Sequence, residues 1–290
     1  MIALYEATTF IFDPLHRFWE DDRTQKTVAG ILIFVFLLAL ATIELKRQGL
    51  IVGGLGDQIP TSHYMAISLA FTLVLVLEVI SLIFTLPCSI SKAVGKQFEI
   101  LALILLRSAF KTLADFPEPI TITGHEQELW IILTDGGGAV VIFALLGLYR
   151  LLQNKLDETI KGGPTLFRFV AAKKMVALVI LAIFVVMGVQ NGLNMLGGGA
   201  SHHFFLNFYT VLIFSDIMLV LIAQRFLPEF RAVFRNSGFA LATLLIRLAL
   251  TAPPYYNVAI GIGAAVFACL LTLTYNTFYS NASKYARRQH

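Results

Sequence analysis

The chain has 290 residues, of which 57% are hydrophobic and only 14% are charged, with a formal net charge of +4. A soluble domain carries about 25% charged residues, so this chain has too little polar surface to cover a water-soluble body of its size. These values exclude a soluble globular enzyme and a disordered protein. Two cysteines exclude a disulfide-stapled domain.

Residues 1–27 are rich in aromatic and apolar side chains around Asp13-Pro14. We expect this segment to lie at the membrane interface, with Trp19 and several phenylalanines dipping into the lipid.

Eight apolar runs follow, each long enough or nearly long enough to cross about 30 Å of hydrocarbon. Because a spanning segment must satisfy its own backbone hydrogen bonds, we expect helices. The sequence therefore predicts an all-α polytopic membrane protein of about eight transmembrane helices. The third and seventh runs are short and contain an arginine. The runs are Thr27–Glu44, His63–Pro87, Phe98–Lys111, Leu129–Tyr149, Met175–Leu196, Phe204–Gln224, Gly238–Ala252 and Tyr255–Tyr279.

Most lysines and arginines fall on one side if both termini are cytoplasmic. The positive-inside rule therefore predicts a multi-pass protein of a bacterial inner membrane with both ends inside. Basic residues concentrate in a linker, 151–174, and a tail, 281–290. Pro87 and Pro228 are expected to end the second helix of each half at the inner face.

The two halves resemble each other, which predicts parallel repeats over 28–150 and 175–280. The run 98–107 aligns with 238–247, and each run ends in an arginine. An acid lies in the second helix of each half.

The repeated unit resembles a known family. The second half resembles the four-span PsiE-type (phosphate-starvation-inducible) membrane proteins. The residues that carry the resemblance are Asp216, the Leu227-Pro228 pair with Arg231, the run Leu245-Ile246-Arg247-Leu248 and the Pro253-Pro254 pair. The first half keeps Glu78, Pro87 and Arg107. The resemblance implies that the chain is a tandem pair of such units. It supports a prediction of the fold more than a prediction of the activity.

Four ionisable residues are expected at mid-membrane: Glu78, Arg107, Asp216 and Arg247. Inserting each of them into the membrane costs about 3 kcal/mol of free energy on insertion scales. We expect Glu78 to contact Arg107 and Asp216 to contact Arg247. In each pair, two guanidinium nitrogens are expected to contact the carboxylate. All four residues are expected about nine residues from the inner ends of their helices. Such pairs can pin the bundle, the favoured interpretation, or can relay protons or ions.

Asp135, Gly136 and Gly137 begin a glycine-rich stretch in the fourth apolar run. An unwound helix there would make a cation site from carbonyls and one carboxylate. The alternative, a flexible helix end with close packing, is favoured.

His63, His202 and His203 open the second helix of each half. Together they could bind haem or a divalent metal. Interfacial histidines need no ligand, so no cofactor is the favoured expectation.

The leading functional hypothesis is transport or conduction of a cation or protons. An alternative is a non-catalytic membrane subunit or scaffold, and a third is a haem-carrying electron-transfer subunit. The expected partners are the lipid bilayer and, in the scaffold hypothesis, other membrane subunits or a homo-oligomer. No soluble domain is expected to bind nucleic acid, and no motif of a hydrolase or ATPase occurs.

Overall fold

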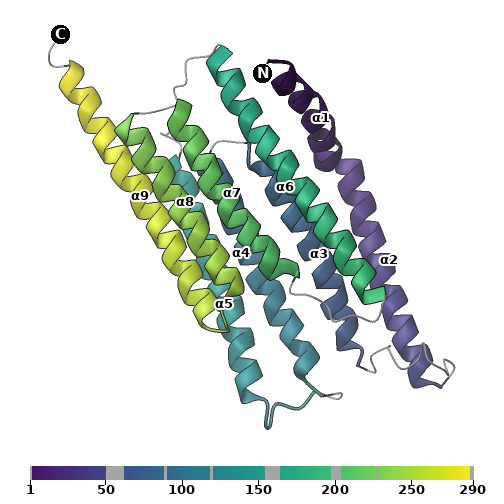
Figure 1. Ribbon diagram of the computed structural model, residues 1–290. Coiled ribbons are helices and arrows are strands. Elements are labelled where there is room, and N and C mark those ends of the chain that lie inside the picture. Colours follow the sequence, from purple (N-terminus) through teal and green to yellow (C-terminus); the bar gives the residue numbers. More distant parts are fainter. Residues whose placement is uncertain are drawn as a thin grey trace.

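The computed structural model describes residues 2–49, 62–87, 90–117, 120–153, 164–196, 204–226 and 229–287. The regular structure within those ranges is helical, and long helices run up and down in one bundle (Figure 1). The elements are α1 (Ile2–Glu20), α2 (Asp22–Arg47), α3 (Tyr64–Thr85), α4 (Ile90–Lys111), the short 3₁₀ turn η2 (Thr112–Asp115), α5 (Glu126–Gln153), α6 (Pro164–Leu196), α7 (Phe204–Phe226), α8 (Phe230–Thr251) and α9 (Tyr256–Arg287).

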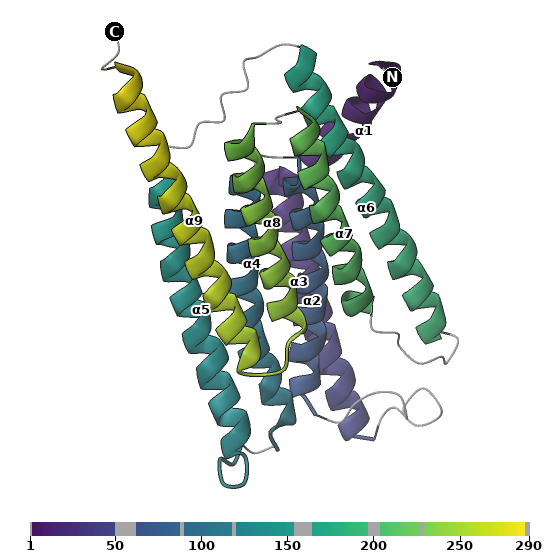
Figure 2. The same cartoon turned by 60° about the vertical axis from the view of Figure 1, so that its left-hand side comes forward.

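Seven of the described helices are long and apolar enough to cross a membrane, namely α2, α3, α5, α6, α7, α8 and α9. The chain is thus built as a polytopic membrane protein. Both termini lie at one end of the bundle (Figures 1 and 2). We call this the terminal end; α3, α5, α7 and α9 finish there.

Helix α4 differs most from its predicted bounds. It begins at Ile90 rather than Phe98. The prediction missed these residues because the lysines in the first two turns lower the hydropathy of the segment. Its 22 residues give a length of about 33 Å, enough to cross a membrane, yet it is not among the seven apolar helices. It contacts α3, α5 and α8. The crossing by an eighth helix stays a prediction.

Other boundaries also differ from the sequence interpretation. Helix α3 ends at Thr85, which confirms a break at Pro87, whereas Pro228 lies outside the described residues. Much of the predicted basic linker is helical, because α6 already begins at Pro164. Helix α9 continues to Arg287, into the predicted tail.

The apolar core has two parts, and each combines helices of both halves. One lies among α4, α5, α8 and α9 and includes Phe98, Tyr149 and Phe239. The other lies among α1, α3, α6 and α7 and includes Phe12 and Phe208. Neither half therefore has a core of its own. The two-repeat arrangement stays a prediction.

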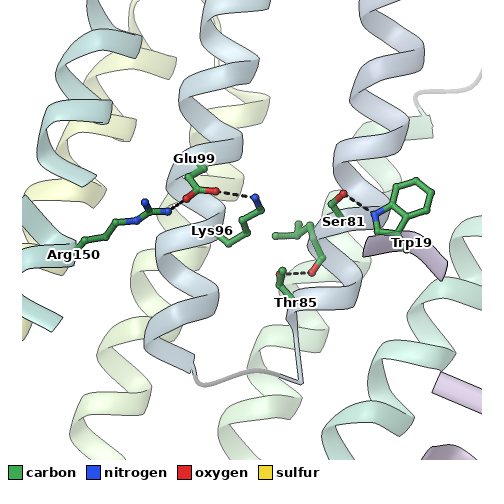
Figure 3. Close-up of polar contacts among 7 residues, drawn as sticks. Trp19, Ser81, Thr85, Lys96, Glu99 and Arg150 are labelled. Atoms are coloured by element: carbon green, nitrogen blue, oxygen red, sulfur yellow. Dashed lines mark hydrogen bonds and ion pairs between the residues drawn. The ribbon is translucent and has the colours of Figure 1, made fainter. Parts of the chain in front are cut away.

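Helix α1 packs on protein through one of its faces. Phe12 lies edge-on to Phe84 of α3, and the Trp19 indole donates a hydrogen bond of 2.8 Å to the Ser81 hydroxyl (Figure 3). Lys174 of α6 makes a 2.6 Å ion pair with Asp13. The Trp19 N–H thus has a partner on α3, and the interfacial placement of residues 1–27 stays a prediction.

Candidate functional site: buried charge pairs

Asp216 and Arg247 form the most deeply buried charge pair of the described residues. Asp216 is 7% exposed on α7, and Arg247 is 2% exposed on α8. Their closest atoms, Arg247 Nε and Asp216 Oδ2, are 3.8 Å apart. That distance permits charge attraction but is too long for a hydrogen bond. The expected two-point contact is therefore not formed in this pair.

Glu78 of α3 and Arg107 of α4 form the second pair. A terminal nitrogen of Arg107 is in direct ion-pair contact with Glu78 Oε1, and both side chains are partly exposed. Each pair thus joins two consecutive antiparallel helices of one half, α3 with α4 and α7 with α8. The structure brings together the same partners that the sequence suggested.

The depth of the arginines differs from the sequence estimate. Arg107 lies 17 positions after Ile90, and Arg247 lies 17 positions after Phe230, in two helices of 22 residues. Both arginines are therefore near the far end of their helices. The acids sit closer to the terminal end, Glu78 only seven positions before Thr85. Contact is still possible because helical side chains lean toward their own N-terminus, so partners on antiparallel helices lean toward each other.

Tyr209 interacts with one member of each pair. It is buried on α7, within electrostatic range of both Arg247 and Glu78. Its hydroxyl is the kind of neutral polar group that can accept from an arginine. Sequence reasoning missed it, because one tyrosine in an apolar helix has no distinguishing spacing.

A small cavity borders Asp216. It measures about 20 Å³, taken as the space open to the centre of a water molecule. Its polar lining comes from Gln97, Asp216 and Thr243, on α4, α7 and α8 respectively. Among the described residues, Gln97 Oε1 and Asp216 Oδ2 have no hydrogen-bond partner. Gln97 and Thr243 were also missed from the sequence, since neither carries a charge.

Asp135 does not lie in an unwound segment. Helix α5 is continuous through Gly136 and Gly137, so their backbone carbonyls belong to the helix and are not freed for a cation. Asp135 Oδ1 instead accepts a 2.9 Å hydrogen bond from the Asn257 amide of α9. Close packing occurs at Gly138, where an added Cβ would lie 2.4 Å from Val258.

His63 lies beside Glu44 at the end of α2, with His63 Nε2 and Glu44 Oε2 3.2 Å apart. His202 and His203 lie outside the described residues. The parts of the chain that the structure describes contain no group of three or more histidine, cysteine or acidic side chains placed to hold a metal ion. The histidine cofactor site stays a prediction.

A polar cluster on α4 and α5 was not predicted. Glu99 contacts both Lys96, at 2.8 Å, and Arg150 (Figure 3). This cluster ties the charged first half of α4 to the end of α5, close to the terminal end. The neighbouring Tyr149 hydroxyl donates to the Ser91 carbonyl over 2.8 Å.

Comparison with protein-family models, with curated proteins and with solved structures found no match to this chain. The resemblance to PsiE-type units therefore depends on the residues quoted above alone.

Proposed function

We propose that this protein transports protons, or a cation exchanged for protons, and that Asp216 is the group that takes up and releases the proton. The observation that carries the proposal is the state of Asp216. It is buried between helices, held by Arg247 at 3.8 Å without a hydrogen bond, and borders a water-sized cavity. An ionisable residue inside a membrane bundle with these neighbours is by default a functional candidate.

Arg247 gives this site a means to couple proton uptake to movement. A guanidinium stays protonated in proteins, so Asp216 is the partner that changes charge. A proton on Asp216 removes the attraction that holds Arg247 in place. Arg247 is then a buried cation without a counter-charge, which is costly, so proton uptake favours its displacement. Tyr209, on the same helix as Asp216, interacts electrostatically with both Arg247 and Glu78.

Proton flux into proteoliposomes tests the proposal, with a pH-sensitive dye inside the vesicles. Asp216→Asn keeps the shape of the side chain but cannot ionise, so we expect flux to fall to the level of empty vesicles. Asp135→Asn is the matched control, because Asp135 is also a buried aspartate but already accepts from Asn257. Equal flux through wild type and Asp216→Asn, with both proteins folded, contradicts the proposal.

A second candidate function is a non-catalytic subunit or scaffold, in a larger membrane complex or a homo-oligomer. The observation that favours it is that polar contacts join helices at several levels: Glu78 with Arg107, Asp135 with Asn257, and Trp19 with Ser81. In this case wild-type vesicles show no flux, and the protein co-purifies with stoichiometric partners. A Soret band in the visible spectrum of purified protein would instead favour the haem-carrying subunit.

We further propose the cellular setting expected from the charge distribution. The chain is a tandem PsiE-like protein of a bacterial inner membrane, with both termini cytoplasmic. The two termini lie at one end of the bundle, which supports their placement on the same side of the membrane.

A further inference from the structure

Gln97 and Asp216 border one small cavity from helices that are far apart in the sequence. The cavity offers about 20 Å³ to the centre of a water molecule. One water needs roughly 10–15 Å³ by the same measure. The space therefore suits a single water and is too small for a hydrated ion.

The unpaired polar atoms around this cavity call for a ligand that can donate two hydrogen bonds. Gln97 is 2% exposed, and its Oε1, like Asp216 Oδ2, has no hydrogen-bond partner among the described residues. Buried polar atoms are nearly always hydrogen-bonded, so each unpaired atom requires an explanation. The Thr243 hydroxyl is already engaged, because it donates to the Ala240 carbonyl over 2.8 Å and also interacts with the Asp216 carboxylate.

Charge balance favours a neutral ligand. Arg247 already compensates the carboxylate of Asp216, so a metal cation in the cavity would leave a net positive charge inside the membrane. A water molecule adds no charge, and its two O–H groups can donate to the two unpaired acceptors, Gln97 Oε1 and Asp216 Oδ2.

The cavity lies on one side of Asp216. Leu219 and Val220, which line it, are nearer than Asp216 to the terminal end of α7. Leu86 at the end of α3 and Ala93 in the first turn of α4 complete the lining on that side. Arg247, in contrast, is one turn farther from the terminal end than Thr243 on α8.

We propose that this cavity holds one bound water that joins the Gln97 amide to the Asp216 carboxylate, and that protons reach Asp216 from the terminal end through this water. The water site depends on the cavity alone, whereas its role as a proton carrier rests on the proposed transport function. In the transfer, an incoming proton bonds to the water oxygen while one of the water's own protons passes to Asp216 Oδ2. The water is thereby regenerated.

The water site is tested first, with the full-length protein in lipid nanodiscs. An experimental structure that resolves waters should show density within hydrogen-bond distance of both Gln97 and Asp216. Infrared spectra of protein with ¹³C-labelled aspartate should show an Asp216 carboxyl band that shifts in Gln97→Leu and does not shift in Gln153→Leu. Gln153 is a matched control because it bonds to the Ser91 carbonyl, away from the cavity. A cavity without density, together with an unshifted band, overturns the water site.

The proton-carrying role is tested separately by flux. Gln97→Leu should slow proton entry by about tenfold or more while Asp216 stays in place, and Ala93→Val, which fills the cavity, should do the same. Unchanged flux in both variants overturns this role even if the water is present. If wild-type protein shows the water but no flux, the transport function fails and the water site stands.

Discussion

At the scale of single residues, the two acid–arginine pairs are not equivalent in geometry. Glu78 and Arg107 touch directly and are partly exposed, whereas Asp216 and Arg247 are more deeply buried and more loosely paired. The tighter pair is suited to holding α3 and α4 together. The looser pair has room to open, which suits a group that changes its charge.

Removing one member of the deeper pair should be strongly destabilising. We expect Arg247→Ala to lower the free energy of unfolding by about 3–5 kcal/mol, because it leaves Asp216 buried without a counter-charge. The measurement is thermal or denaturant unfolding in detergent. The exchange Asp216→Arg with Arg247→Asp should recover most of the loss. No recovery, with each single variant as stable as wild type, would contradict a buried pair.

A packing prediction concerns the glycines of α5. Gly138→Ala should destabilise the protein by about 1–3 kcal/mol, since the new Cβ would lie 2.4 Å from the Val258 side chain of α9. Gly136→Ala is the matched control: its Cβ meets nothing within 4 Å, and alanine is the better helix former by about 1 kcal/mol. The same unfolding assay separates the two. Equal effects would show that α5 and α9 are not closely packed at Gly138.

The charged residues of the site could be predicted from sequence, and its neutral residues could not. Acids and arginines stand out in apolar helices, and consecutive antiparallel helices bring them together. Gln97, Thr243 and Tyr209 are single polar residues with no repeating pattern. Their role depends on the contacts among α4, α7 and α8, which hydropathy does not encode.

At the scale of elements, α1 shows how an amphipathic segment is divided between protein and surroundings. Phe12 is 3% exposed against α3, whereas Phe10, two positions earlier, is 81% exposed. The sequence indicated a helix with aromatic residues but not which of them face protein. That choice is made by α6 and α3, which are distant in the sequence.

This difference gives a paired prediction. Phe12→Ala removes a buried ring and should weaken docking of α1 by roughly 3 kcal/mol, whereas Phe10→Ala should have little effect on docking. Hydrogen–deuterium exchange of the amides in α1 is the readout. Faster exchange is expected for Phe12→Ala only, and equal exchange in both variants would show that α1 is not anchored through Phe12.

The bounds of the helices follow the same logic. Predicted and observed limits agree closely where apolar runs stop at a proline or a charged residue, as at α3 and α7. They differ where a helix continues through charged residues. The first turns of α4 are helical although they carry Lys92 and Lys96, and Lys96 makes an ion pair with Glu99 of the same helix.

At the scale of the whole molecule, the arrangement of helices depends on contacts between the two halves. Helices α4 and α5 pack on α8 and α9, and α3 contacts α6. Sequence similarity between the halves predicted two separate four-helix units, but it carries no information about how such units meet. The two apolar cores that combine helices of both halves could therefore not be predicted from the sequence.

The orientation of the bundle can be tested with single cysteines in a background without Cys88 and Cys269. Thr123 is exposed between η2 and α5, at the end opposite the termini. Thr123→Cys should react with an impermeant maleimide in intact cells, and Lys161→Cys, outside the described residues, should react only after lysis. The inverse pattern would place both termini outside.

The docking of α1 has a consequence for synthesis in the cell. Its partner Lys174 is 161 residues downstream of Asp13. At about 5–20 residues per second, the ribosome needs roughly 8–30 s to make that stretch. Throughout this interval α1 has been synthesised but α6 has not, so the part of the α1 apolar face that packs on α6 is uncovered. A transcript that stops after α5 yields a product whose first helix lacks its α6 partner, and quality-control proteases that recognise exposed apolar segments would act there first.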